Sequence, residues 1–94
     1  MKSIIQSEKE CYITKSTTNL HKHHIFEGTA NRKLSERDGM WIWLRAEWHN
    51  MSDYRVHLDK ELDLVLKRTA QLIWQTYYKK TKKEFIARYG RNYL

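Results

Sequence analysis

Cysteine, proline and glycine are scarce in this sequence: its 94 residues include one Cys, no Pro and three Gly. A single thiol, Cys11, excludes an internal disulfide and any zinc site that needs two or more thiolates, and it suits a reducing cytosol. The chain also lacks a run of 18 or more uncharged apolar residues, and residues 1–8 contain no apolar stretch of signal-peptide length. We therefore expect no membrane span, no secretion and a cytoplasmic location.

Apolar and aromatic residues are plentiful by contrast. Hydrophobic residues make up 40% and aromatic residues 13% of the sequence, including four Trp and six Tyr. This content is too high for a disordered tail, and a chain of this length forms one core that buries about 60% of its unfolded surface. We expect one folded domain spanning residues 1–94.

Positive charge is in excess and unevenly placed. Basic residues outnumber acidic residues by 18 to 11, which gives a formal net charge of +7. Residues 55–94 hold most of the excess, with ten basic and four acidic side chains. Such a balance favours polyanionic partners, nucleic acid above all.

Two helices are predicted in the C-terminal part. Residues 58–78 carry apolar side chains three or four positions apart, the period of one helix face. Thr81 and Glu84 form a capping-box pattern, and Gly90 follows a few residues later, so a short second helix should end near this glycine. The expected buried face of the long helix consists of Leu62, Leu66, Ala70, Ile73 and Tyr77.

Two strands are predicted upstream. Residues 40–44 form an apolar run of bulky residues after a turn dipeptide, Asp38-Gly39. A partner strand should close with His23 and His24, near residues 25–26. Between the strands, residues 27–39 predict a polar loop with a helical turn around residues 31–37. The expected order is strand, loop, strand, helix, helix.

The five histidines all lie between residues 21 and 57. A hairpin that turns back on itself, followed by a crossing helix, would bring His23, His24, His49 and His57 together, as a divalent metal site requires. Neighbours on a regular strand point to opposite faces, so His23 and His24 suit two different tasks, a metal ligand and a general base.

The pattern resembles the HNH endonucleases, or ββα-metal nucleases, and in particular their small phage-encoded members. The resemblance is carried by the segments 11–14, 20–25 (Leu-His-Lys-His-His-Ile), 43–44 and 47–50 (Glu-Trp-His-Asn), and by the chain ending at residues 90–94. It implies an α+β fold with an HNH-like ββα-metal core: a short β-hairpin packed on a long C-terminal helix, plus a short terminal helix. Residues 1–10 would be an N-terminal arm, 11–57 the ββ-metal region and 58–94 the basic helical part.

The resemblance also implies a reaction and its residues. His23 would be the first metal ligand, His49 the second and His57 the third, while His24 would be the general base that deprotonates water. The residue that orients the base in this family would be Asn31 or Asn50. The reaction would be hydrolysis of DNA phosphodiester bonds with one divalent ion, Mg²⁺ or Mn²⁺, in the host-cell cytoplasm. Imidazole ligands would also bind Ni²⁺ or Zn²⁺ in vitro.

A structural zinc is not expected. Many family members build a zinc knuckle from two CxxC pairs, but here Cys11 is followed by Thr14, and Arg45 and Trp48 occupy the later positions. The stabilisation must then come from hydrophobic packing, because a structural zinc supplies on the order of 10 kcal/mol to folding. The candidates for this packing are Tyr12, Ile13, Trp41, Trp43 and Trp48.

Two groups of basic residues are candidates for nucleic-acid binding. One is Arg32 with Lys33, and the other is Lys79, Lys80, Lys82 and Lys83; each would contact phosphates or be simply solvated. An alternative to the nuclease is a catalytically impaired module of the same fold that binds DNA or a host protein, such as a phage inhibitor of host defence. A homodimer would suit an enzyme that cuts both strands.

Overall fold

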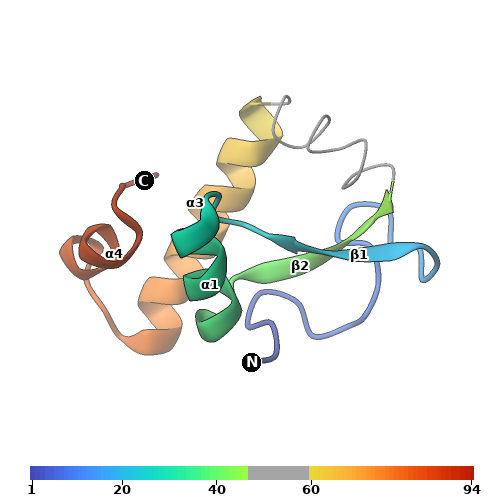
Figure 1. Ribbon diagram of the computed structural model, residues 1–94, viewed down its shortest axis with the longest axis horizontal. Coiled ribbons are helices and arrows are strands. Elements are labelled where there is room, and N and C mark those ends of the chain that lie inside the picture. The colour runs from blue at the N-terminus through green and yellow to red at the C-terminus, as the bar shows by residue number, and fades with distance from the viewer. Residues whose placement is uncertain (47–59) are drawn as a thin grey trace.

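The computed structural model describes residues 1–46 and 60–94, and its elements lie in the order β1, α1, β2, α3, α4 (Figure 1). Their bounds are β1 Leu20–His24, α1 Thr29–Asp38, β2 Trp41–Arg45, α3 Lys60–Tyr78 and α4 Lys82–Tyr89. The strands pair antiparallel, with Leu20 opposite Arg45 and His24 opposite Trp41. The α+β class, the paired strands and the two C-terminal helices are thus confirmed, while the HNH-like identity of the core stays a prediction.

The segment between the strands differs from the prediction. Residues 27–39 were expected to form a polar loop with one helical turn, but α1 is a ten-residue helix. Its N-cap, Gly28, has no side chain to cap the first turn, and only one side chain in its last eight residues, Leu34, is strongly apolar. The local pattern therefore does not predict this helix. Tertiary contacts stabilise it instead, because Ser35 and Asp38 are buried against the rest of the fold.

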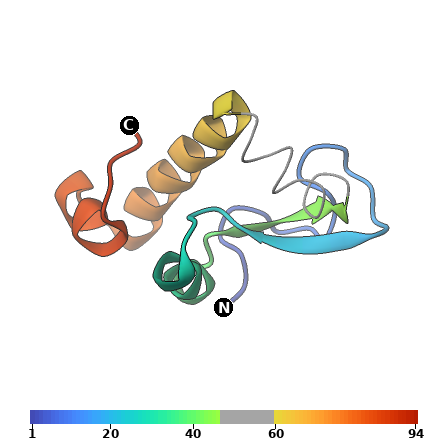
Figure 2. The ribbon, with the colours of Figure 1, turned by 45° about the horizontal axis from the view of Figure 1, so that its top comes forward.

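The core lies between the sheet and the C-terminal helices. Ile42 and Leu44 of β2 are fully buried, and Leu66 and Ala70 of α3 are buried in the same cluster. Figure 2 shows α3 and α4 on one side of the two strands, with α1 at the end of the sheet where β1 ends and β2 begins. Phe26, two residues after the end of β1, packs against α4, since its ring lies 5.3 Å from that of Phe85 and 4.5 Å from that of Tyr89.

The buried face of α3 matches the predicted face only in part: Leu66 and Ala70 are buried, Leu62 and Ile73 are partly buried, and Lys67 and Gln71 are buried without having been predicted. Tyr77 was expected to be buried, but it is 56% exposed, and Trp74 is buried instead. The cause lies in α1: Trp74 donates through Nε1 to Asp38 Oδ2 at 2.9 Å, and Tyr78 donates through its hydroxyl to Asp38 O at 2.9 Å. The end of α3 therefore turns the side bearing Trp74 and Tyr78 toward α1.

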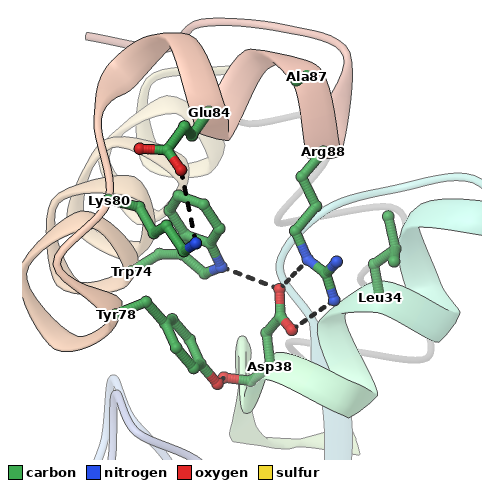
Figure 3. Close-up of a pocket in the computed structure, with 8 residues that line it drawn as sticks. All are labelled: Leu34, Asp38, Trp74, Tyr78, Lys80, Glu84, Ala87 and Arg88. Carbon is green, nitrogen blue, oxygen red and sulfur yellow. Dashed lines mark hydrogen bonds and ion pairs between the residues drawn. The ribbon is translucent and has the colours of Figure 1, made fainter.

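Asp38 connects three helices (Figure 3). Its side chain is 8% exposed and accepts two hydrogen bonds from Arg88, at 2.6 and 2.7 Å, and one from the Tyr89 hydroxyl at 2.7 Å, besides the bond from Trp74. Burial alone would raise the pKa of this carboxyl, but the hydrogen bonds from Arg88, Tyr89 and Trp74 together hold the pKa below its ordinary value.

The N-terminal residues run along β2. Ile4 N donates to Gly39 O at 3.0 Å, and Tyr12 N donates to Trp43 O at 2.8 Å, so the arm covers backbone groups beside the strand. Cys11 is fully buried, and Thr14 N lies 3.4 Å from its Sγ. Cys11 thus packs as part of the core. Trp48 lies outside the described residues.

The α4 helix begins and ends as its sequence predicts. Thr81 accepts from Glu84 N and Glu84 reaches back to Thr81 N, so both halves of the capping box are present, and Gly90 closes the helix with a φ of 82°. Among the described helices none has the length and apolar character needed to cross a membrane.

Candidate functional site

The two histidines at the end of β1 occupy opposite faces of the sheet. His23 is 3% exposed and pairs across the sheet with Ile42, a core residue. His24 pairs with Trp41, and its side chain is 23% exposed. The regular strand geometry separates the two imidazoles in this way. His24 therefore lies on the face of the strand that solvent reaches, and His23 lies on the face toward the core.

A pocket of about 510 Å³ lies beside His24, between β1 and α1. The strand contributes two lining residues and the helix contributes four. The helical residues are spaced i, i+3, i+4 and i+7, which places them on one side of α1. The complete lining is Lys22, His24, Thr29, Arg32, Lys33 and Glu36. The pocket thus brings the predicted base together with the predicted phosphate contacts Arg32 and Lys33.

Glu36 is the acidic residue of this pocket, and it bridges two residues of β1. Its Oε2 lies 2.7 Å from His24 Nε2, and its Oε1 lies 2.8 Å from Lys22 Nζ. The hydrogen bond from Lys22, followed by the one from His24, lowers the pKa of the Glu36 carboxyl despite partial burial. Lys22 is held in turn by an aromatic ring, since its Nζ lies 4.1 Å from the centre of Trp41.

The other predicted site residues are placed differently. Asn31 is on the side of α1 that faces α4, where its Nδ2 donates to Tyr89 O at 3.3 Å. His49, Asn50 and His57 lie in residues 47–59, outside the described part of the chain. Among residues 1–46 and 60–94, Glu36 is hydrogen-bonded to the His24 ring, whereas Asn31 is hydrogen-bonded to the α4 backbone.

The lysine-rich group lies apart from the His24 pocket. Lys79, Lys80, Lys82 and Lys83 occupy the turn between α3 and α4 and the first turn of α4. Lys80 lies 3.4 Å from Glu84 Oε2, and both residues line a second pocket of about 650 Å³, next to Asp38 and Arg88 (Figure 3). The structure therefore divides the predicted phosphate contacts between two places, and only Arg32 and Lys33 share a pocket with His24.

The described residues include only one of the three predicted metal ligands. Within residues 1–46 and 60–94, no three His, Cys, Asp or Glu side chains gather closely enough to hold a metal ion. His23 is the one predicted ligand in these ranges, and its partners His49 and His57 lie outside them. The proposed ligand set thus stays a prediction.

Glu36 is the site residue that the sequence did not reveal. It falls in the segment predicted as a polar loop, where a glutamate carries no signal of its own. On a helix spanning residues 29–38, Thr29, Arg32, Lys33 and Glu36 share one polar face, and this helix is the signal that would have indicated Glu36.

Comparison of the chain with models of known protein families, with curated proteins and with solved structures finds no match.

Proposed function

We propose that this protein is a metal-dependent endonuclease of the HNH kind that hydrolyses phosphodiester bonds in DNA. The observation that supports this best is the His24 pocket, in which an imidazole hydrogen-bonded to a carboxylate lies beside the cations Arg32 and Lys33. A phosphate diester is an anion that such cations bind, and an imidazole is the side chain best suited to take a proton from water at neutral pH.

In the proposed reaction, His24 takes one proton from a water molecule as the water oxygen attacks phosphorus. The phosphorus–oxygen bond to the leaving group breaks, and the leaving oxygen receives a proton from solvent. Arg32 and Lys33 hold the non-bridging oxygens of the same phosphate.

The chemistry of the predicted ligand set fits a divalent ion. His23 is a buried imidazole, and His49 and His57 would supply the same type of nitrogen, which transition metals prefer over the oxygen ligands that suit Mg²⁺. A bound ion would offset the negative charge that builds on the phosphate oxygens. His23, however, points into the core on the face of β1 opposite the His24 pocket, so its position does not by itself support an ion beside the phosphate that Arg32 and Lys33 would hold.

Plasmid nicking by the purified protein tests this proposal, with EDTA, Mg²⁺ or Mn²⁺ present. We expect metal-dependent nicking that falls by about 10²–10⁴-fold in His24→Ala, since a general base contributes a factor of this size. His49→Ala should also lose nicking, and His21→Ala is the matched control on the same strand. Nicking that neither His24→Ala nor His49→Ala reduces would contradict the assignment.

The same samples separate the nuclease from a binding module. Absence of nicking by the wild type with every metal, together with salt-sensitive DNA binding, would indicate that the fold binds DNA without cutting it. Calorimetry with Mn²⁺ provides a measurement that does not depend on cleavage: we expect about one ion per chain and its loss in His23→Ala.

A further inference from the structure

Glu36 links two residues of β1 through one carboxylate. Lys22 and His24 are two positions apart on the strand, so their side chains lie on the same face. Glu36 approaches this face from α1, and each of its oxygens meets one of the two side chains, at 2.8 Å from Lys22 Nζ and 2.7 Å from His24 Nε2. The carboxylate therefore has a separate partner for each oxygen.

When the His24 ring is neutral, the protons in this group of three have only one arrangement. The Lys22 ammonium can only donate, and an ionised carboxylate can only accept. The hydrogen bonds from Lys22 and His24 lower the pKa of Glu36, which keeps it ionised. His24 Nε2 must then carry the proton that it shares with Glu36. A neutral imidazole has one N–H, so the lone pair is on Nδ1.

We propose that Glu36 is a positioning residue for His24, which holds the ring in the Nε2–H form so that Nδ1 receives the proton from the attacking water. This inference rests on the proposed function and names the residue that orients the base, a role that the family resemblance assigns to Asn31 or Asn50. Lys22 contributes by directing Oε1 away from the ring, and Trp41 holds Lys22 in place with its ring 4.1 Å from Nζ.

The substitution Glu36→Gln tests whether Glu36 sets the tautomer of His24, because a carboxamide has one accepting oxygen and one donating nitrogen. Lys22 can only donate, so the amide oxygen should turn to Lys22 and the amide nitrogen to His24. Nε2 then has to accept, and the His24 proton moves to Nδ1. A nearly isosteric change thereby inverts the tautomer of the ring and removes the lone pair from Nδ1.

Nuclear magnetic resonance of the His24 ring nitrogens in ¹⁵N-labelled full-length protein measures this directly and without substrate. We expect the proton on Nε2 in the wild type and on Nδ1 in Glu36→Gln. In the double variant Lys22→Met with Glu36→Gln, no ammonium holds the amide oxygen, so this oxygen can turn to His24 and accept from Nε2–H. We therefore expect the proton to return to Nε2. Glu61→Gln, an exposed glutamate on α3, is the matched control and should leave the His24 spectrum unchanged.

Cleavage kinetics complete the test. Glu36→Gln should lower kcat by about 10²–10⁴-fold with little change in KM, because it removes the action of the base rather than a contact with substrate. Part of kcat should return in the double variant, which a merely structural role for Glu36 would not explain. An unchanged His24 tautomer in Glu36→Gln would overturn this inference and leave the endonuclease standing. A wild type that cleaves nothing would overturn the endonuclease, and the ring spectra would still decide whether Glu36 sets the tautomer.

Discussion

At the scale of single residues, two carboxylates of α1 have different environments. Asp38 is 8% exposed and is surrounded by donors from α3 and α4, whereas Glu36 is 44% exposed and borders the His24 pocket. Asp38 therefore contributes mainly to stability, and Glu36 is accessible to a ligand. Neither role follows from sequence spacing, because the partner Arg88 is 50 positions from Asp38 along the chain.

Replacing Asp38 tests its contribution. Asp38→Asn removes the ion pair with Arg88 and presents an amide nitrogen to donors that then lack an acceptor. We expect the free energy of unfolding to fall by about 2–4 kcal/mol, as for a largely buried charged pair that loses one member. Urea denaturation measures this change, and Glu61→Gln should stay within about 0.5 kcal/mol of the wild type. Equal stabilities of the Asp38→Asn and Glu61→Gln variants would contradict the role of Asp38.

The same residue predicts how stability depends on pH. The pKa of Asp38 is lower in the folded chain than in the unfolded chain, so its contribution is present above the unfolded pKa of about 3.9. That contribution is lost as the pH falls through the lower, folded pKa. Urea midpoints measured from pH 6 down to pH 2 should therefore decline more steeply for the wild type than for Asp38→Asn. Parallel curves would show that the Asp38 carboxyl is not coupled to folding.

At the scale of elements, the success of sequence prediction follows the strength of local signals. The α3 helix has a regular apolar period, and α4 has a capping box and a terminal glycine, so each can be recognised from its own residues. The α1 helix ends at a glycine, Gly39, but has neither an apolar period nor a capping box, and contacts with distant residues stabilise it. Tyr77 fits the apolar period of α3 but lies where no described element covers it, and only the tertiary arrangement reveals this.

Two glycines that end helices give a matched comparison. Gly39 after α1 and Gly90 after α4 have φ angles of 72° and 82°, which disfavour any residue with a Cβ atom. A Cβ at Gly39 would collide with Lys2 O and lie 3.1 Å from Ile4 N, whereas a Cβ at Gly90 would meet no atom within 4 Å. The two positions thus differ in packing and share the backbone strain.

We therefore expect unequal costs for the two alanine variants. Gly90→Ala should lose about 1 kcal/mol from the left-handed backbone alone. Gly39→Ala should lose about 3 kcal/mol, because the N-terminal arm must also move away from β2. Thermal and urea unfolding of both variants measure the difference. Equal losses would show that the arm does not pack tightly against this turn.

At the scale of the whole molecule, the positive charge is organised into separate groups. The net charge of +7 favours a polyanionic partner, and the structure places Arg32 and Lys33 in the His24 pocket and the lysine-rich group at the turn after α3. Sequence could predict the charge excess and its members. It could not predict which cations share a pocket with the histidine, since this depends on α1.

Salt-dependent DNA binding measures how these groups are used. Each cation that neutralises a phosphate adds about 0.9 to the slope of log affinity against log salt concentration. The double substitution of Arg32 and Lys33 by Gln should reduce this slope by about 2, and so should that of Lys82 and Lys83. Lys60→Gln, at the opposite end of α3 from the lysine-rich turn, is the control. An unchanged slope in the first double variant would contradict phosphate binding at the His24 pocket.

The buried Cys11 offers a practical consequence. It is the sole cysteine of the chain, it is fully buried, and backbone hydrogen bonds hold the turn around it, with Cys11 N donating to Ser16 O at 2.7 Å. A thiol reagent can modify Cys11 only when the turn around it opens. The labelling rate in the absence of denaturant therefore reports the free energy of opening this turn. A fluorophore or spin label attached to a cysteine engineered on the surface would consequently stay free of background from the native thiol.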